Sequence, residues 1–194
     1  MDASFAEWLP AMALAIALAA TAGIRAWLPL LLAGLLVRAG WLELGASFAF
    51  LASTKALVVF ATATVLELLG DKVPAVDHAL DALGTPLKLA AGALLAAAAL
   101  GTVTDPLTSM ILGVAVGAPT ALVPHAAKSL LRIASTTATG GLANPVLSLL
   151  EDVMAVALFA LAVLVPLAVA GFVLLVVALL ARRRAARPPI PGVA

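Results

Sequence analysis

Hydrophobic residues form long runs along the chain, and short polar segments separate them. The approximate bounds of these runs are 10–38, 50–71, 85–104, 105–132 and 146–181. A helix that crosses a bilayer needs roughly 20 mostly apolar residues, so each run is long enough to cross. The pattern therefore predicts an all-α membrane protein.

The last run is too long for one crossing. As a single helix, Val146 to Ala181 would measure about 54 Å at 1.5 Å per residue, against a hydrocarbon layer of about 30 Å. We therefore expect Pro166 to divide it, which gives about six transmembrane helices. A short amphipathic helix is expected near 74–83, with Pro74 in its first turn and Gly84 just past its end.

An internal repeat relates the two halves of the chain. A shift of 81 residues places Val65–Asp71 on Val146–Asp152, with five of seven positions identical. A shift of 80 places Pro86 on Pro166. We expect two three-helix repeats, residues 1–104 and 105–184, followed by a disordered basic and proline-rich tail at 185–194. Three crossings per repeat would invert the second repeat relative to the first.

Composition supports membrane insertion and removes several function classes. The chain has 194 residues, of which 64% are hydrophobic and 11% charged, whereas soluble domains are about 45–50% apolar and about 25% charged. A net charge of +1 and the absence of cysteine argue against nucleic-acid binding and thiol chemistry. We expect no enzyme activity, cofactor or metal. The expected partners are the bilayer and a small solute or ion, and the chain could also form a homo-oligomer.

Basic residues indicate an orientation. The last apolar run is followed by Arg182, Arg183, Arg184 and Arg187. Because basic residues favour the cytoplasmic side, we expect both termini in the cytoplasm and the protein in the inner membrane.

Charged residues inside the apolar runs are the candidates for function. Arg25 lies near the middle of the first run, where a cation is costly, so it needs a carboxylate partner. The candidates are Glu67, Asp71, Glu151 and Asp152. A structural ion pair is the plainer alternative to a functional role.

Two further sets of side chains each fall on one helix face. His125, Lys128 and Arg132 form a basic stripe, which predicts either an anion-attracting lining or a structural ion-pair ladder. Glu67 and Asp71 share another face, and the repeat relates them to Ser148 and Asp152. These carboxylates could hold a cation or a proton, or they could pair with Arg25, Lys72 and Lys128.

The polar segment 135–144 interrupts the apolar pattern. Because Gly140-Gly141 and Pro145 disfavour a helix, we expect this segment, with Thr136 and Thr139, to be non-helical at membrane depth. Asn144 should cap a helix that restarts at Pro145, leaving the amides of Val146 and Leu147 pointing into a cavity. An ordinary cytoplasmic loop is the alternative. Gly23 and Pro29 are also expected to interrupt the helix of the first apolar run.

Four strings of residues resemble a known family. They are Ala22–Pro29, Glu67–Pro74, Asp77–Asp81 and Ser135–Pro145. They are similar to a bacterial family of multi-pass membrane proteins that is known as a domain of unknown function. The resemblance covers about residues 10–165, and it implies no activity and no catalytic residues.

These observations predict a small transporter or channel for a small solute or ion, with an anion favoured. Lipid or lipid-linked head-group translocation is one alternative, in which Arg25, Lys128 and Arg132 hold a phosphate. A non-transporting scaffold or assembly factor is another, and its interior would be dry with every charge paired. The residues expected to line the pathway are Arg25, Glu67, Asp71, Lys72, Lys128, Arg132, Thr136, Thr139, Asn144, Ser148, Glu151 and Asp152.

Overall fold

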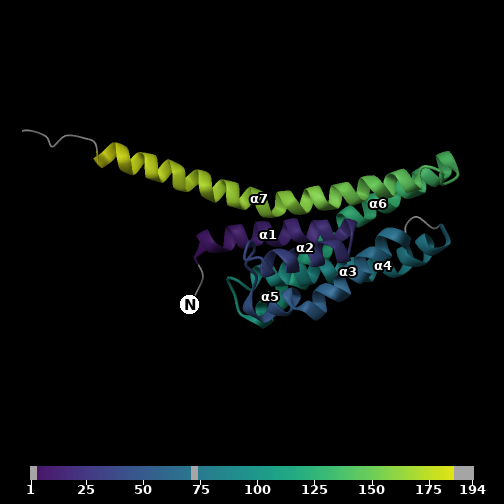
Figure 1. The fold of residues 1–194 in the computed structure, drawn as a ribbon, viewed down its shortest axis with the longest axis horizontal. Helices are drawn as coiled ribbons and strands as arrows, with labels where there is room; N and C mark the ends of the chain where they lie inside the picture. Colours follow the sequence, from purple (N-terminus) through teal and green to yellow (C-terminus); the bar gives the residue numbers. More distant parts are fainter. Residues whose placement is uncertain (1–3, 71–73, 186–194) are drawn as a thin grey trace, which may run out of the picture.

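The structure is a computed structural model that describes residues 4–70 and 74–185. Every regular element in these residues is helical, as predicted (Figure 1). In chain order the elements are α1 (Phe5–Ile24), α2 (Trp27–Arg38), η1 (Ala46–Ala52), α3 (Thr54–Gly70), α4 (Pro74–Leu100), α5 (Pro106–Leu112), η2 (Gly113–Gly117), α6 (Ala118–Thr139) and α7 (Asn144–Ala185). Here η1 is a 3-10 helix and η2 is a π-helical turn within a continuous helix from α5 to α6.

Several of the described helices are apolar and long enough to cross a membrane. Three qualify, namely α1, the continuous helix from α5 to α6, and the first part of α7. A fourth crossing results if η1 and α3, which meet at an angle of 58°, form one span. These helices indicate a membrane protein.

Small residues bring the central helices close together. The α1 side chains of Ala15, Leu18 and Ala22 are fully buried. A Cβ atom at Gly23 would overlap the Ala121 carbonyl oxygen of α6, so only glycine permits this approach. The close contact places the end of α1, and with it Arg25, deep among the helices.

The first apolar run is broken at Arg25, within the interval where Gly23 and Pro29 predicted an interruption. α1 ends at Ile24, Arg25 is extended (φ −132°, ψ 127°), and α2 begins at Trp27. Pro29 lies in the first turn of α2, where a proline removes no helical hydrogen bond. The break leaves the first amides of α2 in need of partners from elsewhere.

The second half of the first repeat differs from the prediction. α4 begins at Pro74, as expected, but it continues without interruption to Leu100. A separate helix over 74–83 that ends before Gly84 is therefore wrong. Pro86 lies inside α4 and does not end it. The physical reason is that a proline removes only one backbone hydrogen bond, and a long helix can tolerate that loss by bending.

The division of the last run at Pro166 is also wrong. α7 is one helix of 42 residues from Asn144 to Ala185, and it passes through Pro166 (Figure 1). The physical reason is the same as at Pro86. The predicted tail at 185–194 lies outside the described residues, apart from Ala185, which ends α7.

The segment 135–144 is less irregular than predicted. α6 continues through Thr139, because the hydroxyls of Thr137 and Thr139 donate to carbonyls one turn earlier and so leave the helix intact. The chain turns only at 140–143, where Gly140 and Gly141 adopt positive φ angles of 64° and 87°. A non-helical segment over 135–139 is therefore wrong, whereas the break at the two glycines is confirmed.

The expected cap of α7 is also corrected. Asn144 Nδ2 donates to Thr136 Oγ1 at 3.2 Å, and its Oδ1 atom accepts no hydrogen bond within the described part of the chain. The amides of Val146 and Leu147 donate to the Ala143 carbonyl, so they do not point freely into a cavity.

A clear N-cap is found instead at α5. Asp105 Oδ1 accepts hydrogen bonds from the amides of Leu107 and Thr108 at 3.0 and 3.1 Å. Hydrogen bonding from the Thr108 side chain, and then from these amides, lowers the pKa of the exposed Asp105 carboxyl. The cap fixes where the fourth apolar run starts.

Candidate functional site

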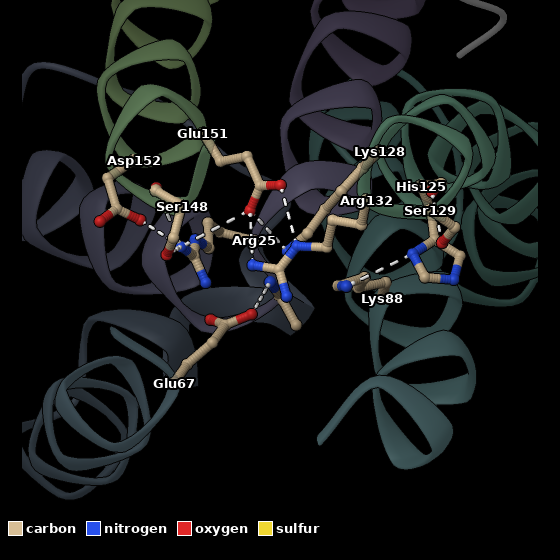
Figure 2. Close-up of polar contacts among 11 residues, drawn as sticks. Arg25, Glu67, Lys88, His125, Lys128, Ser129, Arg132, Ser148, Glu151 and Asp152 are labelled. Atoms are coloured by element: carbon tan, nitrogen blue, oxygen red, sulfur yellow. Dashed lines mark hydrogen bonds and ion pairs between the residues drawn. The ribbon is translucent and has the colours of Figure 1, made fainter. Parts of the chain in front are cut away.

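Arg25 occupies the break between α1 and α2 and is fully buried (Figure 2). Its Nη2 atom lies 2.5 Å from Asp152 Oδ1 and 3.8 Å from Glu151 Oε2, both on α7. The same atom donates to Ser148 Oγ at 3.0 Å. The prediction that Arg25 pairs with a carboxylate is confirmed, and the partners come from a helix more than 120 residues away in the sequence.

Glu151 connects Arg25 with the basic stripe of α6. Lys128 Nζ lies 2.9 Å from Glu151 Oε2, and Arg132 Nε lies 3.2 Å from Glu151 Oε1. A second bond joins Arg132 Nη2 to Glu151 Oε2 at 3.2 Å, which makes this pair bidentate. One carboxylate of α7 therefore faces three cations.

Glu67 of α3 stabilises the other side of the break. Its carboxylate accepts hydrogen bonds from the amides of Ala26 and Trp27 at 3.0 and 3.3 Å. These are the first amides of α2, and a carboxylate at a helix N-terminus is favourable. Glu67 thus caps the half-helix that begins inside the protein.

Lys88 and Thr85 of α4 extend this group toward His125 of α6. Lys88 Nζ lies 3.3 Å from His125 Nδ1, and Thr85 Oγ1 lies 2.8 Å from His125 Nε2. Lys88 and His125 are only 3% and 7% exposed. Neither Lys88 nor Thr85 was predicted as a site residue, although a lysine within an apolar run is itself a signal for an interior polar site.

We refer to these side chains together as the polar cluster. Its members come from the break, α3, α4, α6 and α7 (Figure 2). They are Arg25, Glu67, Thr85, Lys88, His125, Lys128, Arg132, Ser148, Glu151 and Asp152.

The cluster contains only part of the predicted site. Seven predicted residues belong to it, namely Arg25, Glu67, Lys128, Arg132, Ser148, Glu151 and Asp152. Thr136, Thr139 and Asn144 lie apart, close to the turn between α6 and α7, and both threonines are exposed. Asp71 and Lys72, together with the expected approach of Asp71 to Asp152, lie outside the described residues.

The chemistry of the cluster is that of cations and carboxylates in an apolar shell. Burying a charge is expensive unless it is paired and hydrogen-bonded, and the named contacts supply such pairing. Ammonium and guanidinium groups bind anions, and the imidazole can take up a proton. Among the side chains that the structure describes, those of residues 4–70 and 84–165, no group of three or more has the arrangement of a metal site.

Two cavities lie near α1 and α2. One, of about 170 Å³, is apolar and borders the break, with Ala26, Trp27 and Phe60 among its lining residues. The other, of about 530 Å³, lies near the start of α1, with Glu7, Glu43 and Thr102 in its lining. α1 therefore runs from a partly polar cavity at its start to the polar cluster at its end.

The fold and the cluster define an all-helical protein of membrane type with a charged interior. Residues 12–185 match the family described as Domain of unknown function (DUF4126), and the chain belongs to this family. This match confirms the resemblance that the four sequence strings carry. No curated protein and no solved structure matches the chain.

Proposed function

We propose that the chain is a small inner-membrane transporter or channel that passes a small solute or ion, and that the solute is an anion. The observation that carries this proposal is the polar cluster, in which Arg25, Lys128 and Arg132 are all buried at a helix break. Ionisable groups within membrane helices are costly, and they commonly mark solute or ion pathways. The proposed activity makes and breaks no covalent bond.

The choice of an anion follows from the type of side chain that gathers at the break. Cations from α1, α4 and α6 converge there, and positive side chains with low-dielectric walls concentrate anions. Discontinuous membrane helices also place their N-termini at solute sites in several transporter folds. An anion would compete with Glu151 for Lys128 and Arg132, so the ion pairs seen here would open as the solute passes.

We also propose that the chain consists of two inverted three-helix halves with six crossings and both termini in the cytoplasm. This arrangement requires α1 and α2 to move apart, because Glu7 and Glu43, at the two ends of the first apolar run, line the same cavity in the described conformation. One contact pattern supports the repeat. Glu67 and Ser148 are superposed by the shift of 81 residues, and each bonds to the break at Arg25–Trp27 from its own helix. Two positions that the proposed repeat makes equivalent therefore both bond at this break.

The cavity near the start of α1 supports a solute route along α1, because it lies at the end of this helix that is opposite to Arg25. Glu7 and Arg25 are separated by about 27 Å along α1 at 1.5 Å per residue. Between them, Ala15, Leu18, Ala19 and Ala22 are fully buried. We therefore assign the described conformation to a closed state, in which the cavity and the polar cluster are not connected.

Two other functions each have one observation in their favour. The apolar cavity beside the break would suit the chain of a lipid whose phosphate is bound by Arg25, Lys128 and Arg132, as guanidinium groups bind phosphate well. The ion pairs around Glu151 are also what a non-transporting scaffold would require.

Flux measurements on the purified protein in vesicles separate these three functions. We expect chloride flux to exceed potassium flux and the movement of a fluorescent phospholipid. Lys128→Met should lower chloride flux by about tenfold or more, the low end of the effect of focused charge on local ion concentration. Ser129→Ala is the matched control, because its hydroxyl bonds only to the His125 carbonyl of its own helix.

Each alternative gives a different result in the same assay. Lipid movement without chloride flux would support head-group translocation. The absence of both, relative to protein-free vesicles, would contradict the transport proposal and favour the scaffold.

A further inference from the structure

His125 is held at both ring nitrogens by side chains of α4 (Figure 2 draws the lysine contact). The Lys88 ammonium has three N–H donors and no acceptor. Since it lies 3.3 Å from His125 Nδ1, that nitrogen has to accept, and the ring proton then resides on Nε2. The Nε2–H group donates to Thr85 Oγ1 at 2.8 Å. These two contacts match a neutral imidazole that carries its proton on Nε2.

We propose that His125 is a proton-binding site that couples proton uptake to the passage of the anion. This proposal rests on the proposed function and names the ion that drives it. A proton that adds to Nδ1 converts the acceptor into a donor, and the N–H group then faces the Lys88 ammonium. The contact becomes repulsive, and the polar cluster gains one positive charge.

The gain of charge links the proton to the anion. An anion binds better to a cluster with one more positive charge, and by linkage the bound anion favours the protonated ring to the same extent. Proton and anion are therefore expected to cross in the same direction.

The ionisable neighbours of His125 are consistent with this role. On α6 itself they are Lys128 and Arg132, and the described side chains of α4 contribute Lys88. The same helix carries Asp77, His78 and Asp81, whose side chains lie outside the described part of the chain. Beyond these, the described charges of the cluster are Arg25 at the break, Glu67 on α3, and Glu151 and Asp152 on α7 (Figure 2). η2 carries no ionisable residue. The described carboxylates of the cluster lie next to Arg25, Lys128 and Arg132, which leaves the imidazole as the proton acceptor that we propose and these cations as the groups that attract the anion.

The test combines flux with a direct observation of the ring. Chloride uptake into vesicles should be several-fold faster with an inward proton gradient than without one. His125→Gln keeps an acceptor for Lys88 and a donor for Thr85 but binds no proton, so it should lose the acceleration by the gradient, and its lower chloride flux should be independent of pH. Ser129→Ala, the matched control on the same helix, should respond to the gradient like the unmodified chain.

Nuclear magnetic resonance of the histidine nitrogens provides a readout that does not depend on flux. The chain has two histidines, so His78→Gln leaves His125 as its single imidazole. We expect the neutral Nε2–H tautomer at neutral pH and conversion to imidazolium on acidification. The Nδ1–H tautomer, or a ring that does not titrate, would overturn the proposal even if His125→Gln failed to fold.

The flux results also separate this proposal from the one on which it rests. Chloride flux without pH dependence, or pH dependence that survives in His125→Gln, would overturn the proton coupling and leave anion passage in place. The absence of chloride flux at every pH would overturn both.

Discussion

At the scale of single residues, the burial of Arg25 is the most informative feature of this chain. Its position in an apolar run was enough to predict a carboxylate partner, because an unpaired cation there is too costly. The sequence could not select Asp152 over Glu67, because that choice depends on how α1 packs against α7. Lys88 and Thr85 were missed for a related reason, since their role appears only when α4 lies beside His125 of α6.

The Arg25–Asp152 pair provides a prediction at this scale. Asp152→Leu should lower the free energy of unfolding by about 3–5 kcal/mol, because it removes the closest partner of a fully buried guanidinium. Arg25→Met combined with Asp152→Leu should recover most of that loss, since apolar residues can replace a buried ion pair. Denaturant unfolding in detergent micelles measures both values. Equal destabilisation in the single and double variants would contradict this account, because the loss would then not come from leaving the guanidinium unpaired.

At the scale of the elements, glycine and proline positions predicted some helix ends correctly and others wrongly. The break near Gly23, the start of α4 at Pro74 and the turn at Gly140-Gly141 were all predicted and confirmed. Pro86 and Pro166 were wrongly expected to separate helices, because one missing hydrogen bond does not end a long apolar helix. The hydroxyls of 135–139 were misjudged as well, since they bond back within α6.

The continuity of α7 leads to a prediction about the number of crossings. A straight helix of 42 residues measures about 63 Å at 1.5 Å per residue, roughly twice the hydrocarbon layer. Six crossings therefore require α7 to open near Pro166 in the membrane. Under this proposal, reporter fusions at Gly141 and Ala194 lie on the same side, and a fusion at Gly45 lies on the opposite side. Fusions at Gly141 and Ala194 on opposite sides would show that α7 crosses once.

At the scale of the whole molecule, the distribution of charge is the reverse of that in a soluble protein. Large apolar side chains such as Val58, Leu107 and Val114 are exposed, while Arg25, Lys88, Lys128 and Arg132 are buried. Composition was sufficient to predict this arrangement and the membrane class. It could not indicate whether the interior opens to water, because a dry ion-pair scaffold and a closed transport pathway have the same composition.

Water access to the polar cluster is the measurement that decides between these two interiors. The chain has no cysteine, so Ser148→Cys introduces a single thiol beside Arg25, and Ser109→Cys introduces one at another fully buried serine. The Ser109 hydroxyl donates to the Pro106 carbonyl of its own helix, away from the polar cluster, which makes it the matched control. If the cluster lines a pathway, a charged thiol reagent that does not cross lipid should modify Ser148→Cys in vesicles, block its chloride flux and leave Ser109→Cys unmodified. Modification of Ser148→Cys no faster than that of Ser109→Cys would contradict a pathway through the polar cluster.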